Sequence, residues 1–228
     1  IAPAGCESPA SRLDISAGLA RQLTQMVSDQ TLTIVAFGSS STQGQGASGP
    51  DHSYPALLAG YLREKFPGFQ VQVINRGVGG DVVESMLARL QRDVIDSGAD
   101  LVLWQTGTND AIRGVPLERF ATLLQEGLAR LAAADIGVVL IDPQFYPDSS
   151  AITAYPAYVE AMDRIADSRD VGQYHRYAQI RELSQQQPQS NAAQLSADRF
   201  HQSDAGYACL ARSLAEGLAA ALQTQEAR

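Results

Sequence analysis

A glycine- and serine-rich segment is the first candidate for chemistry: "GSSSTQG", residues 38–44, follows a run of strand-forming residues. A loop of this kind has two physical uses. Its backbone N–H groups and hydroxyls can bind a phosphate, or it can expose one serine as a nucleophile at a strand-to-helix turn. The residues elsewhere in the chain have to decide between these uses.

A base and a carboxylate lie close together near the C-terminus, in "DRFH". A serine hydroxyl is a weak nucleophile until a base takes its proton, and histidine is the usual base near neutral pH. Asp198 stands three residues before His201, a spacing at which the carboxylate can face the imidazole and orient it. Charge that develops on an attacked carbonyl also needs hydrogen-bond donors. The candidates are the backbone N–H groups of Ser40 and Gly80 and the side-chain amide of Asn109.

Four segments resemble the conserved blocks of the SGNH hydrolases, also called GDSL-like esterases and lipases. The first block, Gly-Asp-Ser-x-Thr-x-Gly, matches "GSSSTQG" and places the nucleophile at Ser40. The second block ends in a glycine before an acidic or polar residue, which matches Gly80. The third, Gly-x-Asn-Asp, matches "GTND" and gives Asn109. The last, Asp-x-x-His, matches "DRFH", so the resemblance implies a catalytic triad of Ser40, His201 and Asp198.

One position departs from the family pattern. Ser39 stands where the family has an aspartate. That aspartate is not the acid of the triad, so the chemistry should survive its replacement. The hydrogen bonding that holds the nucleophile loop is expected to loosen. Three serines are now adjacent, and the choice of Ser40 rests on the register with Thr42 and Gly44.

Alternating strands and helices must bring these segments together. We expect strands at residues 32–37, 69–74, 100–106, 137–142 and 171–177, and helices at residues 15–27, 54–66, 82–95, 117–134, 155–166 and 205–223. Near-continuous apolar runs in three of the strands are typical of parallel strands covered on both faces. The sequence therefore predicts an α/β fold: a three-layer α/β/α sandwich with a five-stranded parallel sheet, flavodoxin-like as in SGNH hydrolases. Ligands of such sheets bind at the carboxyl ends of the strands, where the blocks fall.

The 228 residues are interpreted as a single domain, with an N-terminal extension and helix over residues 1–30 and a catalytic core over residues 31–225. The irregular segment after the fourth strand offers Gln144, Phe145 and Tyr146 as the wall of a substrate pocket. Trp104, inside the third strand, is expected in the core.

Composition narrows the classes of function. A net charge of −8 argues against a nucleic-acid partner, which requires a basic surface. No apolar run reaches the roughly 18 residues of a membrane span. The three histidines, His52, His175 and His201, lack the spacing of metal ligands, so neither a metal nor a cofactor is expected. The oligomeric state is not indicated.

The two cysteines leave two interpretations of the compartment. A Cys6–Cys209 disulfide would pin the N-terminal segment to the last helix and would indicate an oxidising compartment, hence a secreted or periplasmic protein. Alternatively, Cys209 is a small buried residue, and a cytoplasmic location stays open.

The resemblance implies hydrolysis of carboxylic esters through an acyl-enzyme. Because no lid-like insertion is visible, we expect short acyl groups such as acetyl, on a small molecule or a carbohydrate. Two alternatives stay open. First, the loop at residues 38–44 also resembles the phosphate-binding loop of flavodoxins, which would make the chain a flavin- or phosphate-binding protein. Second, a chain with the SGNH hydrolase fold could be a catalytically inactive binding module. The flavin interpretation leaves "GTND" and "DRFH" unexplained.

Overall fold

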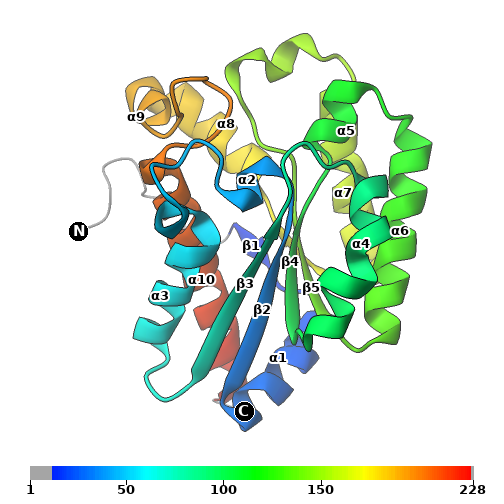
Figure 1. Ribbon diagram of the computed structural model, residues 1–228, viewed down its shortest axis with the longest axis vertical. Helices are drawn as coiled ribbons and strands as arrows, with labels where there is room; N and C mark the ends of the chain where they lie inside the picture. Colours follow the sequence, from blue (N-terminus) through cyan, green and yellow to red (C-terminus); the bar gives the residue numbers. More distant parts are fainter. Residues whose placement is uncertain (1–11, 227–228) are drawn as a thin grey trace.

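The computed structural model describes residues 12–226, and its centre is a six-stranded sheet in the order β1-β6-β5-β4-β2-β3 (Figure 1). The strands are β1 (Leu13–Asp14), β2 (Thr31–Gly38), β3 (Gln70–Gly77), β4 (Leu101–Gln105), β5 (Gly137–Ile141) and β6 (Gly172–Tyr174). Strands β2 to β6 run parallel in the flavodoxin-like order, which confirms the predicted fold class. Strand β1 was not expected from the sequence, and it pairs antiparallel with β6 at one edge of the sheet.

Helices cover both faces of the sheet, as predicted. The α-helices are α1 (Ala17–Asp29), α2 (Ser40–Gln43), α3 (Tyr54–Lys65), α4 (Val83–Asp93), α5 (Thr108–Arg113), α6 (Leu117–Ala133), α7 (Tyr155–Arg169), α8 (Arg176–Gln186), α9 (Pro188–Ala193) and α10 (Asp204–Glu226). Three short 3₁₀ turns, η1 (Pro50–His52), η2 (Ile95–Ser97) and η3 (Pro147–Ala151), complete the described elements. Helices α3 and α10 lie on one side of the sheet and α4, α6 and α7 on the other (Figure 1).

The alternating side chains of β2 show why the sheet needs helices on both faces. Leu32 and Ile34 point into the core beneath α1, α3 and α10, whereas Val35 and Phe37 point into the core beneath α4, α6 and α7. All four are at most 1% exposed. Because successive side chains of a strand face opposite sides, a continuous apolar run is what a doubly covered strand requires.

The fifth predicted strand is shorter than expected. Residues 171–177 were predicted as a strand, but β6 ends at Tyr174 and α8 begins at Arg176. The chain leaves the sheet at His175, whose N–H donates to the Arg12 carbonyl at 2.9 Å.

The loops that follow the strands gather at one edge of the sheet. The strands point to the top of Figure 1, where α2 and α5 lie. Gly38 and Gly77 are paired at the ends of β2 and β3. A Cβ on Gly77 would lie 2.0 Å from the backbone nitrogen of Gln43, so only glycine lets β3 approach α2 this closely.

Two further predictions concern the chain ends and membranes. Cys209 is buried on α10, but Cys6 lies outside the described residues, so the disulfide stays a prediction. Within residues 12–226, no helix combines the length and the hydrophobicity needed to cross a bilayer.

Candidate active site

Ser40, His201 and Asp198 lie together although Ser40 and His201 are 161 positions apart in the chain. Ser40 is the first residue of α2, two positions after the end of β2, and its Oγ lies 2.9 Å from Nε2 of His201. The other ring nitrogen of His201, Nδ1, lies 2.6 Å from Oδ2 of Asp198. The imidazole therefore connects a hydroxyl and a carboxylate.

Asp198 is held by hydrogen bonds from three neighbours. Its Oδ1 accepts from the Ser196 hydroxyl at 2.6 Å and from the N–H groups of Phe200 and His201 at 2.9 Å each. Burial acts to raise the pKa of Asp198, but these bonds and the one to the His201 ring outweigh it and hold that pKa well below its usual range. The carboxylate is thus ionised near neutral pH.

The turn that brings His201 back onto Asp198 is strained at one residue. Arg199 adopts a φ of 57°, in the left-handed region that residues with a Cβ rarely occupy. The hydrogen bonds to Asp198 from both sides of Arg199 offset this cost, which is typical of functional turns.

The loop that carries Ser40 is anchored to β4. Oε1 of Gln105, at the end of β4, accepts from the Ser39 N–H at 3.0 Å, the Ser39 hydroxyl at 3.1 Å and the Thr42 hydroxyl at 3.2 Å. Gln105 is 1% exposed, so these bonds are shielded from water. The Ser39 hydroxyl, which replaces the family aspartate, is therefore part of the anchor.

The three adjacent serines have different partners. Ser39 bonds to Gln105, and Ser41 donates to Oε1 of Gln144 at 3.0 Å. Only Ser40 of the three lies on the imidazole of His201. The register chosen from the sequence is the one that pairs a serine with the histidine.

The residues predicted as a pocket wall lie among buried partners. Gln144 is 1% exposed, and besides accepting from Ser41 it donates to the Phe200 carbonyl at 2.7 Å. It therefore bridges α2 and the turn before His201. Phe145 packs edge-on against Tyr177, with the ring centroids 5.7 Å apart.

Tyr146 belongs to a line of rings that ends at the histidine. Its ring stands at 90° to that of Phe200, 4.8 Å away, and the Phe200 ring lies 4.6 Å from the His201 ring. These contacts support the imidazole from the side. Contact of Gln144 and these rings with a substrate stays a prediction.

The predicted oxyanion donors come from three loops. The N–H of Ser40 has no partner inside α2 because it opens the helix. Gly80 lies in the turn between β3 and α4 with a φ of 80°. Asn109 donates one of its two amide hydrogens to the carbonyl of Asp81, the residue after Gly80, at 2.8 Å, which leaves the second hydrogen for a ligand.

Asp110 ties two of these loops together. Its carboxylate accepts from the Val83 N–H at 3.1 and 3.3 Å, joining the start of α4 to α5. Burial raises the pKa of Asp110 to about 6. Nearby, Trp104 is fully buried as predicted, and its indole N–H points to the sulfur of Met86 at 3.3 Å.

The chain matches the model of a Non-GDSL lipase-like family over residues 5–224. It belongs to this family. Esterase TesA of Pseudomonas aeruginosa is 31% identical over 147 residues, which are 63% of this chain and 66% of that protein. The acetylxylan esterase of Geobacillus stearothermophilus is 26% identical over 199 residues, 79% of this chain and 88% of that protein.

Solved structures agree on the fold of this lipase-like chain. The acetylxylan esterase Axe2 of Geobacillus stearothermophilus superposes with a TM-score of 0.70 and 23% identity, covering 82% of this chain and 94% of that one. A two-domain esterase active on acetylated mannans gives 0.74 at 20% identity, covering 94% of this chain and 55% of that one. The predicted resemblance to SGNH hydrolases is confirmed, and the chain is a carboxylic-ester hydrolase of this type.

The supporting role of two glutamines was not predicted from the sequence: Gln105 was not a candidate, and Gln144 was predicted only as part of a pocket wall. Gln105 anchors the Ser40 loop, and Gln144 bridges Ser41 and Phe200. A glutamine at the end of an apolar strand is the signal that was available for Gln105, since a buried amide needs partners. The sequence does not say which loops supply them.

Proposed function

We propose that the chain is a serine esterase in which Ser40 is the nucleophile, His201 the general base and acid, and Asp198 the group that orients His201. The observation that supports this proposal is the pair of contacts made by one imidazole: 2.9 Å to the Ser40 hydroxyl and 2.6 Å to the Asp198 carboxylate. Because the ionised Asp198 accepts a hydrogen bond from the proton on Nδ1, Nε2 carries the lone pair that accepts the Ser40 proton.

The reaction then follows from these positions. Ser40 Oγ attacks the ester carbonyl while His201 removes its proton, and the protonated imidazole passes this proton to the leaving alcohol. The charge on the carbonyl oxygen is stabilised by the N–H groups of Ser40 and Gly80 and by the free amide hydrogen of Asn109. Water, activated by His201, releases the acid from the acyl-enzyme.

We propose a short acyl group, acetyl above all, carried by a carbohydrate. The relatives support this choice, since one is named an acetylxylan esterase and a structural neighbour is active on acetylated mannans. Fold alone does not select a substrate, so the proposal needs its own measurement.

The test combines hydrolysis of p-nitrophenyl acetate with intact mass after labelling by a fluorophosphonate probe. Wild-type protein should hydrolyse the ester and gain one probe adduct, and Ser40→Ala should lose both, with kcat reduced on the order of 10⁶-fold. Ser39→Ala and Ser41→Ala are matched controls and should keep the adduct. An adduct that survives in Ser40→Ala would place the nucleophile elsewhere.

Acyl preference is tested separately on p-nitrophenyl esters of increasing chain length and on acetylated xylo-oligosaccharides. We expect kcat/KM to be greatest for acetyl and to fall as the chain lengthens, together with release of acetate from the oligosaccharides. A clear preference for long acyl chains would overturn the acetyl proposal while leaving the serine mechanism in place.

A further inference from the structure

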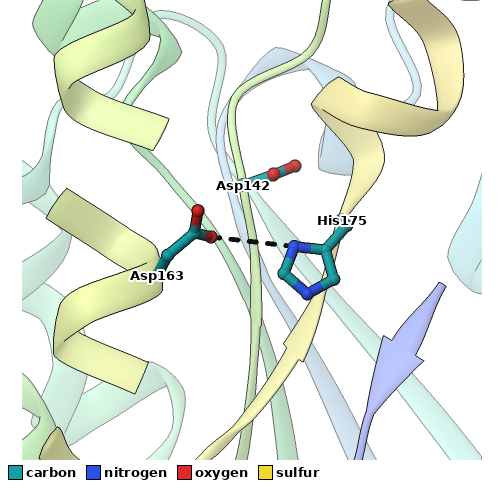
Figure 2. A group of neighbouring side chains, drawn as sticks. All are labelled: Asp142, Asp163 and His175. Atoms are coloured by element: carbon teal, nitrogen blue, oxygen red, sulfur yellow. Dashed lines mark ion pairs between the residues drawn. The ribbon is translucent and has the colours of Figure 1, made fainter. Parts of the chain in front are cut away.

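A second histidine lies among carboxylates outside the Ser40 site. His175 follows β6, and its Nδ1 lies 3.6 Å from Oδ1 of Asp163 on α7. Asp142, directly after β5, joins them: one ligand atom from each of the three side chains lies within 4.8 Å of the others. Figure 2 shows the three converging from different elements, with the Asp142 carboxylate beside the Nδ1 edge of the ring.

Asp142 has an oxygen without a partner. The side chain is 1% exposed, and its Oδ1 accepts from the Tyr177 N–H at 2.8 Å. No group among residues 12–226 donates to its Oδ2. A buried carboxylate oxygen with no donor is costly, so a ligand that satisfies it would stabilise the fold.

The other side of the His175 ring determines what Nδ1 can do. Its Nε2 lies 2.9 Å from Oδ2 of Asp14 on β1. With the proton on Nε2 and donated to Asp14, Nδ1 carries a lone pair that faces Asp163 and Asp142. Histidines that bind metals commonly donate their second ring N–H to a carboxylate in this way.

Two of the three side chains, Asp163 and His175, line a cavity that opens to the surface. This surface cavity of about 520 Å³ is lined by His175 and by four aspartates, Asp14, Asp163, Asp167 and Asp170. An acidic lining raises the local concentration of cations. Gln173 donates to the Asp163 carboxylate and fixes its orientation, as the outer partners of metal ligands do.

We propose that Asp142, Asp163 and His175 bind one divalent transition-metal ion, Zn²⁺ in particular, and that Asp14 is the positioning carboxylate behind His175. One imidazole nitrogen and two carboxylate oxygens suit Zn²⁺, with water completing the tetrahedron, whereas Ca²⁺ and Mg²⁺ prefer oxygen alone. The ion would join the end of β5, α7 and the β6–α8 junction. The absence of a metal expected from the sequence would then be wrong, because the ligands come from three separate elements.

Titration of Zn²⁺ into metal-free, tag-free protein by calorimetry tests this site. Wild type should bind one ion per chain. His175→Gln and Asp163→Asn, both at partly exposed positions, should bind at least about 100-fold more weakly, because each removes a ligand. His52→Gln is the matched control: its ring lies 3.4 Å from Asp204 and 3.9 Å from Asp51, but without a buried, unpartnered oxygen.

The outcomes separate this site from the Ser40 site. One-to-one binding that persists in His201→Gln and in His52→Gln but is lost in His175→Gln supports the proposal. Binding lost only in His201→Gln, binding unchanged in His175→Gln, or no saturable binding tighter than about 100 μM in wild type would each overturn it. Circular dichroism of each variant establishes that it is folded.

Two further measurements test the role of Asp14 and a structural effect of the ion. Asp14→Asn should weaken Zn²⁺ binding about 10–100-fold, whereas Asp167→Asn, which removes the same charge from the same cavity, should have a far smaller effect. Equal effects would overturn the positioning role. At a hundredfold excess over Kd, Zn²⁺ should raise the Tm of wild type by about 5–10 °C and leave that of His175→Gln unchanged.

Discussion

His201 and His175 are two histidines with the same kind of partner on one side and different partners on the other. Each has a ring nitrogen on an aspartate, His201 Nδ1 at 2.6 Å from Asp198 and His175 Nε2 at 2.9 Å from Asp14. The second nitrogen of His201 faces the Ser40 hydroxyl, whereas that of His175 faces carboxylates. The first arrangement can take and return a proton, and the second is suited to a cation. The group that faces the second ring nitrogen therefore determines whether the histidine is suited to proton transfer or to binding a cation.

The carboxylates also differ in how fully they are bonded. Both oxygens of Asp198 have hydrogen-bond partners, so its charge is available to the imidazole without a further ligand. Asp142 has one oxygen with no donor among the described residues. A carboxylate whose oxygens both have hydrogen-bond partners can orient an imidazole without a further ligand. A buried carboxylate oxygen without a donor is energetically costly, so binding of a ligand there would be favourable.

The largest expected effect comes from making the same substitution behind each histidine. Asp198→Asn should reduce kcat about 10⁴-fold, because an amide in place of the carboxylate favours the tautomer with its proton on Nε2, which cannot accept from Ser40. Asp14→Asn makes the identical change behind His175 and should leave kcat unaltered. Steady-state rates on p-nitrophenyl acetate measure both. Equal losses in the two variants would break the comparison.

A smaller effect is expected at the oxyanion donor. Asn109→Ala should lower kcat on the order of 10²–10³-fold with little change in KM, because its free amide hydrogen acts on charge that develops only in the transition state. The Zn²⁺ affinity of this variant should equal that of wild type, since Asn109 has no contact with the His175 group. An enzyme that keeps its full rate would refute the role of Asn109.

The smallest effect concerns support rather than chemistry. Gln144→Leu leaves the Ser41 hydroxyl and the Phe200 carbonyl without their buried partner and should lower the free energy of unfolding by about 1–3 kcal/mol. Urea denaturation measures this change. Gln185→Leu, on an exposed part of α8, is the control and should change stability by less than about 0.5 kcal/mol. Similar values for the two would remove Gln144 from the framework of the site.

Patterns spread over whole elements could be predicted from the sequence. Apolar runs such as residues 100–106 identify buried parallel strands, and the order of the blocks identifies Ser40, Asp198 and His201 as neighbours. Pairings made by few residues could not be predicted. Strand β1 has two residues and no alternation to detect, and the strand expected over residues 171–177 contains β-prone Val171 and Tyr174 yet turns into α8.

The hydrogen-bond partners of buried polar side chains could not be predicted from the sequence either. Gln105 and Gln144 bond to loops that are distant in the sequence, and nothing near either residue specifies those loops. Asp142, Asp163 and His175 are separated by whole elements, so no ligand spacing marks them. Their proximity is a product of strand order, because β5 and β6 are adjacent in the sheet.

Strand β1 has a consequence for how copies of this chain behave toward one another. Its two residues pair with Gln173 and Tyr174 and so cover the open backbone of β6, the strand at that end of the parallel sheet. An uncovered edge of this kind can pair with the edge of a second molecule. Shortening the chain to begin after Asp14 would uncover β6, and such a protein should self-associate as its concentration rises. We therefore expect this two-residue strand to limit aggregation of the chain.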